Sequence, residues 1–286
     1  MSSNTVKLSL FLCLSMCLGI GILRFSYTAL LPGTREAFAW STSFASLLGS
    51  ANLLGYLIGA FVAMRLPQDR SMSAYIQLAA IAGMVSLFCC AFSGFPEIWY
   101  MSWRVISGIS GGLLMILSPS VVAQCCDLKD RFKINFIGFS GIGLGVLLAT
   151  LFLPYLDQIS IRTAWLILCG FALMICICLS LLIQQFKPYL AKQSVSHPAQ
   201  VPLNTVFYSL LAVYACSAFA YIPHSLFWID YLSHELGLSL FWINFNWILY
   251  GLGSALGAFS AYILARKFGN FTALKILYSV YILAIF

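Results

Sequence analysis

The stretch GIGILRFSYTALLP (residues 19–32) lies inside an apolar run that begins at Leu8, and it carries a single arginine, Arg24. The run is long enough to cross a bilayer, which takes about 20 mostly apolar residues in a helix. An arginine near the middle of a span costs at least about 2.5–3.5 kcal/mol, so it faces a bundle interior or a water-filled cavity. The stretch therefore predicts a transmembrane helix with one buried cation.

The rest of the chain has the composition of a membrane protein. Of its 286 residues, 62% are hydrophobic and 8% are charged, and the mean hydropathy is +0.96, whereas a soluble domain carries about 25% charged residues. The net charge of +7 is spread over short basic clusters, which argues against nucleic-acid binding. The ten cysteines lie in apolar runs without metal-ligand spacing, and no catalytic constellation is present. We therefore expect no metal, no cofactor and no enzymatic activity.

Polar loops divide the chain into an all-α polytopic membrane protein of two unequal parts. Residues 1–185 hold six expected helices, and residues 205–286 hold two helices and part of a third. The polar, proline-containing segment 186–204 is the expected linker between them. The expected spans are 8–31, 43–64, 73–93, 98–125, 134–155, 163–185, 205–229 and 241–265, followed by a short apolar segment at 271–286.

The placement of Lys and Arg predicts the orientation, because cytoplasmic loops are enriched in these residues. The N-terminus and alternate loops hold ten of them: Lys7, Arg65, Arg70, Lys129, Arg131, Lys133, Lys187, Lys192, Arg266 and Lys267. The opposite loops hold only Arg35 and Arg162. We expect the N-terminus and the linker to face the cytoplasm, with the protein in the inner (cytoplasmic) membrane.

Small residues recur four apart in several spans, a pattern that lets membrane helices approach closely. The strings GYLIGAF (55–61) and GSALGAF (253–259) resemble each other and are each followed by a basic loop, which suggests two related halves. The expected packing glycines are Gly55, Gly59, Gly108, Gly141, Gly145, Gly253 and Gly257.

Two positive charges lie well inside the spans, Arg24 and Arg104, and no acidic residue lies equally deep. One interpretation is that they bind backbone carbonyls at broken helix ends. Another is that they form a site for an anion such as a carboxylate, sulfonate or phosphate. Polar residues on neighbouring helices would line such a cavity, and His224 follows a proline that could break its helix. The candidate substrate-binding residues are Arg24, Tyr27, Asn52, Tyr56, Arg104 and His224.

Four strings carry a family resemblance. GIGILRFSYTALLP and ANLLGYLIGAF (51–61) resemble the first two helices of the YbfB/YjiJ-like branch of the major facilitator superfamily. WRVISGISGG (103–112) resembles the arginine–glycine motif of the fourth helix of the superfamily, and FSGIGLG (139–145) resembles the glycine-rich fifth helix of the branch. The resemblance implies a secondary transporter that moves a small organic solute by alternating access; the two deep arginines add that the solute is anionic.

The sequence also departs from that family pattern. The basic motif expected between the second and third helices survives only as Asp69-Arg70, and 82 residues remain after the linker, where six helices are expected. We therefore expect a chain that is truncated after its eighth to ninth helix. Its expected partners are the solute, a coupling proton or exchanged anion, and the lipid bilayer, and we expect a monomer.

Two alternatives remain open from the sequence. A truncated, non-transporting membrane protein would account for the short second part. A compact drug/metabolite-type exporter of about ten short helices would also fit a chain of 286 residues. That second class predicts an internal repeat near half-length and no long central linker.

Overall fold

The structure, a computed structural model, describes residues 3–67, 69–150, 159–192 and 204–285. Throughout these residues the regular structure is helical, without strands. Eight helices are long and apolar enough to cross a membrane, which confirms the predicted fold class. A shorter apolar helix, Asn270–Ala284, follows the eighth span.

The first span is broken near its middle, whereas the sequence predicted one regular helix over 8–31. α1 (Ser3–Met16) leads into a π-helical turn, η1 (Cys17–Ile22), and α2 (Phe25–Ala37) then continues the span. Within this break the Leu23 amide donates to the carbonyl of Leu18, five residues back, at 2.9 Å. Glycines permit the close neighbours found here: a Cβ added to Gly21 would lie 2.6 Å from Gly145 Cα. Such π-turns are frequent at functional sites.

The remaining elements are long single helices: α3 (Thr42–Arg65), α4 (Met72–Cys90), α5 (Glu97–Cys125), α6 (Leu128–Thr150), α7 (Ile161–Lys192), α8 (Thr205–His234), α9 (Leu240–Phe268) and α10 (Asn270–Ile285). α7 extends through Pro188 into the expected linker, because Phe186 and Leu190 continue its buried apolar stripe. The rest of the linker, 193–203, and the end of the predicted fifth span, 151–155, lie outside the described residues.

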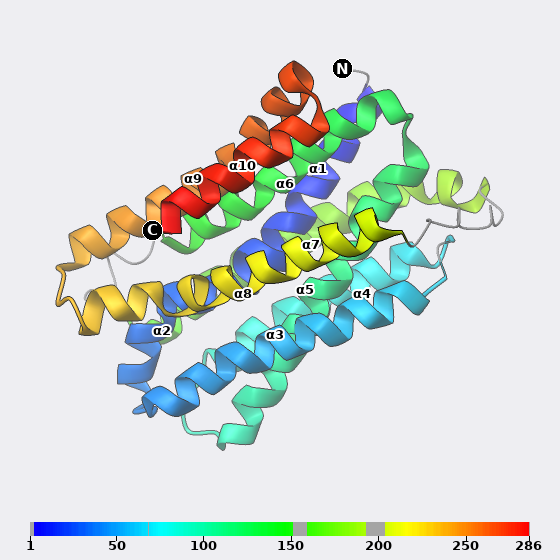
Figure 1. The fold of residues 1–286 in the computed structure, drawn as a ribbon. Coiled ribbons are helices and arrows are strands. Elements are labelled where there is room, and N and C mark those ends of the chain that lie inside the picture. Colours follow the sequence, from blue (N-terminus) through cyan, green and yellow to red (C-terminus); the bar gives the residue numbers. More distant parts are fainter. Residues whose placement is uncertain (1–2, 68, 151–158, 193–203, 286) are drawn as a thin grey trace.

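The broken first span runs through the interior of the bundle (Figure 1). α5 and α6 pack against it, α3 packs along α5, and α4 fills the space between α5 and α7. On the other side α9 packs along α6 and α10 packs against α9, while α8 contacts α2. In Figure 1 the N-terminus and the turn between α9 and α10 lie at the same end of the bundle.

Glycines set the distance between α3 and α5. A Cβ added to Gly55 would lie 2.1 Å from Val105 O, and one added to Gly108 would lie 2.0 Å from Asn52 O. Gly59 has a similar neighbour in α5, at 2.4 Å. The two backbones are therefore in direct contact, which only glycine permits at these positions.

The same kind of contact joins α6 to the first span and to α9. A Cβ on Gly141 would lie 2.0 Å from Cys13 O, and one on Gly145 would lie 2.6 Å from Cys17 O. On α9 the expected ridge is displaced: within the described residues, no atom lies within 4 Å of a Cβ added to Gly253 or Gly257. The α9 backbone instead meets Gly143 through Gly251 and Ala255. α9 carries two parallel stripes of small residues, and the stripe that begins at Gly251 is the one that packs.

Candidate functional site

Arg24 occupies the break in the first span, immediately before α2 begins. Its guanidinium carbon lies 5.2 Å from the centre of the Phe25 ring and 5.9 Å from the centre of the Tyr221 ring. Its Nε is buried without a hydrogen-bond partner among the described residues. Ring faces attract a cation but do not neutralise it, so this arginine keeps hydrogen-bond donors for a further group.

Arg104 is engaged with backbone, and this distinguishes it from Arg24. It is 2% exposed, and its Nη1 donates to the carbonyl of Leu23 at 3.3 Å. Ser107 Oγ donates to the same carbonyl at 3.1 Å, and the Arg104 guanidinium carbon lies 4.3 Å from the centre of the Tyr27 ring. Of the two interpretations left open by the sequence, Arg104 has the bond to a broken helix end. The carbonyl belongs to the first span rather than to a glycine of α5.

Tyr27 and Asn52 belong to the same buried network and do not line an open cavity as expected. The Tyr27 hydroxyl donates to Ala45 O at 2.7 Å, and Asn52 Nδ2 donates to Arg104 O at 3.2 Å. Both side chains are buried. They tie α2, α3 and α5 together, because their polar groups are already bonded to backbone of a neighbouring helix.

Aromatic residues from the second part of the chain complete the surroundings of Arg24. The positive charge of Arg24 acts on the hydroxyl groups of Tyr56, Tyr221 and Tyr250. The hydroxyls of Tyr221 and Tyr250 contact each other. The Phe25 ring lies edge-on to Tyr250, at 5.5 Å between centres, and Trp247 stacks on Tyr250 at 4.8 Å. Arg24 therefore faces α3, α8 and α9 together.

Tyr221, Trp247 and Tyr250 were missed by the sequence reasoning. The available signal was the presence of tyrosine hydroxyls in the middle of apolar spans, since such groups need a partner in a membrane. His224 lies on α8, but its side chain is outside the described residues. α8 continues through position 223 as one helix, so the break expected at Pro223 is absent.

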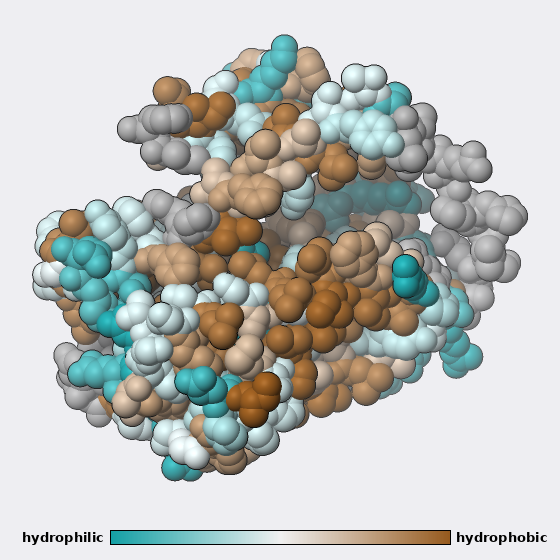
Figure 2. Space-filling model, turned by 60° about the horizontal axis from the view of Figure 1, so that its bottom comes forward, coloured by the Kyte–Doolittle hydropathy of each residue, from teal (hydrophilic) through white to brown (hydrophobic). Residues whose placement is uncertain are grey.

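A second polar cluster joins α2 to α8 at the end that the charge pattern predicts to face away from the cytoplasm. Arg35 Nη1 lies 3.3 Å from Asp230 Oδ1, and Arg35 Nη2 lies 2.5 Å from His234 Nε2. His234 Nδ1 lies 3.2 Å from the same Asp230 oxygen. Thr28 Oγ1 adds a bond to Ser225 O at 3.0 Å. Figure 2 shows a largely apolar face with a deep hollow in it and hydrophilic side chains on the inner wall.

Residues 16–286 match the model of the family described as "Uncharacterised MFS-type transporter YbfB". The chain belongs to this family of the major facilitator superfamily. A relative from Bacillus subtilis (strain 168), the "Uncharacterized MFS-type transporter YceJ", is 25% identical over 273 residues, which is 93% of this chain and 68% of the relative.

Solved structures of the superfamily share the fold. A proton:xylose symporter, XylE, aligns with a TM-score of 0.71 at 16% identity over 93% of this chain and 70% of its own. A bacterial homologue of the human lysosomal transporter Spinster, in an inward-facing conformation, aligns with a TM-score of 0.65 at 19% identity, over 94% of this chain and 64% of its own. The protein is thus a multi-pass membrane protein with the fold of transporters, which are not enzymes. The drug/metabolite-type alternative is set aside by this membership.

Proposed function

We propose that this protein takes part in secondary active transport of a small organic anion by alternating access, and that Arg24 binds the anionic group. The observation that carries the proposal is the contrast between the two deep arginines. Arg104 donates to the Leu23 carbonyl, while Arg24 has a buried, unpaired Nε and no acidic neighbour among the described residues. A carboxylate or phosphate offers the charge and acceptors that this guanidinium lacks.

The position of Arg24 suits transport rather than static binding. Its neighbours Tyr56 on α3 and Tyr221 on α8 come from the two parts of the chain, 1–185 and 205–286, which we propose are the two halves that move. A solute held by both parts binds them differently in each conformation, and that difference is what shifts the equilibrium between conformations. The cluster of Arg35, Asp230 and His234 holds α2 and α8 together at one end, so the proposed access in this conformation is from the other end.

The coupling that we propose is anion exchange or co-transport with a proton. In the described part of the chain, Arg104 is the charged residue that is fully buried, and no carboxylate is buried with it. A proton carried on a buried Asp or Glu is therefore disfavoured. Loading vesicles with the anion, or imposing a pH gradient without it, distinguishes the two forms of coupling by which one drives uptake.

The proposed setting is the inner (cytoplasmic) membrane, as a monomer with its N-terminus in the cytoplasm. The support is the ten-to-two distribution of Lys and Arg between the two sets of loops. A fluorescent reporter fused to the N-terminus should be active in intact cells, because such reporters fold in the cytoplasm. A secreted-enzyme reporter at the same place should be inactive, and the reverse result would overturn the orientation.

The test of the anion site is uptake by the purified full chain in proteoliposomes. The probes are radiolabelled succinate, gluconate, benzoate and phenylphosphonate, each with its neutral amide or ester. One charge-assisted hydrogen bond contributes about 1.5–3 kcal/mol, so Arg24→Gln should weaken apparent affinity for the transported anion roughly 10- to 100-fold. Arg24→Lys should retain part of it, and the exposed Arg65→Gln should match the wild type. Unchanged uptake by Arg24→Gln would refute the site, and no uptake of any probe by the wild type would favour the non-transporting alternative.

A further inference from the structure

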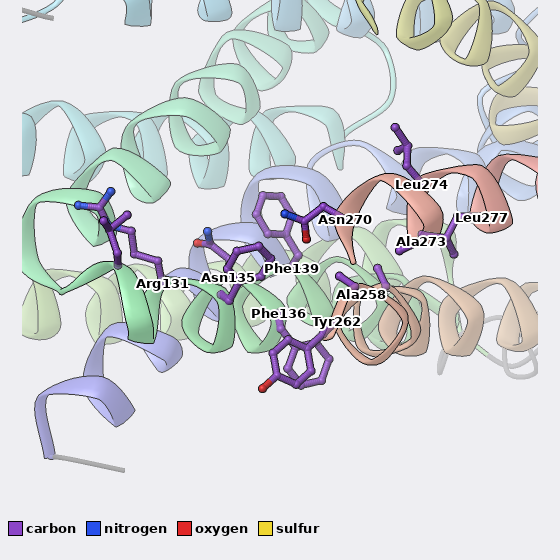
Figure 3. Close-up of a pocket in the computed structure, with 14 residues that line it drawn as sticks. Arg131, Asn135, Phe136, Phe139, Ala258, Tyr262, Asn270, Ala273, Leu274 and Leu277 are labelled. Atoms are coloured by element: carbon purple, nitrogen blue, oxygen red, sulfur yellow. The ribbon is translucent and has the colours of Figure 1, made fainter. Parts of the chain in front are cut away.

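A groove lies between α6, α9 and α10, away from Arg24, with a volume of about 590 Å³. Figure 3 shows Arg131 at one end of it, Asn135, Asn270 and Phe139 near the middle, and Leu274 and Leu277 at the other end. The lining thus changes from polar to apolar along its length. That gradient fits a ligand with a polar head and an apolar body.

We propose that this groove binds an anionic glycerophospholipid of the cytoplasmic leaflet, with hydroxyls in its head group, as phosphatidylglycerol has. The proposal is independent of solute transport. It commits to a lipid because basic pockets between transmembrane helices on the cytoplasmic side are suited to anionic head groups.

Charge at the rim of the groove is complementary to that head group. The segments 127–133 and 266–275 meet at this end of the bundle and carry six basic residues against two acidic ones, Asp127 and Asp130. The basic residues are Lys129, Arg131, Lys133, Arg266, Lys267 and Lys275. Thr5 Oγ1 donates to Asp130 at 3.4 Å. The excess of cations favours a negatively charged ligand over a neutral one.

Two features of the polar end point to the phosphate and to a hydroxyl. α10 begins at Asn270 directly after Gly269, whose φ of 79° ends α9 and turns the chain back. The first amides of a helix favour a phosphate group. Asn135 Oδ1 is buried without a hydrogen-bond partner among the described residues, and a glycerol hydroxyl of the head group would donate to it. Choline has no such donor.

The apolar end matches an acyl chain. From Asn270 to Leu277 the α10 side of the groove extends about 10 Å, at about 1.5 Å per residue. Phe136 and Tyr262 stack at 5.6 Å between ring centres on the opposite side. Leu274 is 36% exposed and Phe132 is 57% exposed, so the groove opens laterally, where a lipid tail enters without crossing a polar barrier.

The test is native mass spectrometry of the delipidated full chain in an equimolar mixture of dioleoyl phosphatidylglycerol, phosphatidylethanolamine and phosphatidylcholine. The wild type should retain one phosphatidylglycerol molecule at least about fivefold more often than phosphatidylcholine, because only the former supplies both charge and donor. The double variant Asn135→Leu/Asn270→Leu should bring that ratio close to one. Leucine suits an apolar groove, so these changes should leave the fold intact.

The matched control is Asn246→Leu, on the same helix as Tyr262 but outside the groove, which should keep the wild-type ratio. Equal retention of the lipids by the wild type would overturn the proposal, as would an unchanged ratio in the double variant. Displacement of the bound lipid by millimolar inorganic phosphate would reassign the groove to free anions. A dimer mass in place of a lipid adduct would reassign it to a second copy of the chain.

Discussion

Replacement of Gly108 by alanine should destabilise the bundle by an amount that follows from the geometry. The added Cβ would lie 2.0 Å from Asn52 O, where about 3 Å is the closest that real Cβ atoms come, so α3 and α5 must separate by about 1 Å. Such overpacking costs about 1–3 kcal/mol. The separation also breaks the 3.2 Å bond from Asn52 to Arg104 O, which adds about 0.5–1.5 kcal/mol. The total is about 2–4 kcal/mol.

The assay is thermal unfolding of the purified chain in detergent, followed by tryptophan fluorescence. At about 2–4 °C per kcal/mol for a chain of this size, Gly108→Ala should lower the midpoint by about 5–15 °C. The matched control is Gly257→Ala, because no described atom lies within 4 Å of the new Cβ. Alanine is the better helix former by about 0.8–1 kcal/mol, so this variant should unfold at the wild-type temperature or slightly above it. Equal midpoints for Gly108→Ala and the wild type would refute the backbone contact.

Two further outcomes follow from polar groups at the helix ends. Asp230→Asn removes the ion pair between α2 and α8, which contributes about 1 kcal/mol or less for a partly exposed pair. Spin labels on the exposed ends of these helices should therefore show a larger population of the separated state, up to about fivefold, and an unchanged distance distribution would contradict the role of this cluster. In the turn before α4, the Ser71 hydroxyl and amide donate to the Asp69 carboxylate and lower its pKa below the ordinary value. Because the folded-state pKa is the lower one, this interaction stabilises the fold above the unfolded-state pKa and is lost as the pH falls through the folded-state pKa. Ser71→Ala should raise the Asp69 pKa in a carboxyl NMR titration, and a pKa that stays low would contradict the assignment.

The spans were predictable because hydrophobic length is a local property of the sequence. The stripe through Gly55 and Gly59 was also readable, since four-residue spacing places small residues on one face of a helix. The same reasoning chose the wrong face of α9, because Gly251 and Ala255 have the same spacing as Gly253 and Gly257. The choice between the two faces depends on the approach of α6, and no local pattern encodes it.

The break in the first span could not be predicted from its own residues. Gly19 and Gly21 permit the π-turn, yet similar glycine pairs stand in regular helices elsewhere in the chain, such as Gly141 and Gly143 in α6. What distinguishes the first span is a partner 81 positions away, because Arg104 donates to the Leu23 carbonyl at the break. Only the packing of α5 against the first span brings these groups together.

The two deep arginines illustrate how residue type and depth leave a role undecided until the neighbours are known. Both lie in apolar spans, and both are attracted to aromatic rings. Arg104 meets a carbonyl from the break and a tyrosine that is itself bonded to α3, so its charge is spent on holding the helices in place. Arg24 lies on the same break but turns toward tyrosines of both parts of the chain, with a buried Nε left unpaired. A break stabilised by one arginine thus presents the other to the space between α3, α8 and α9, and this division of labour explains why a span would carry a cation where a regular helix would not need one.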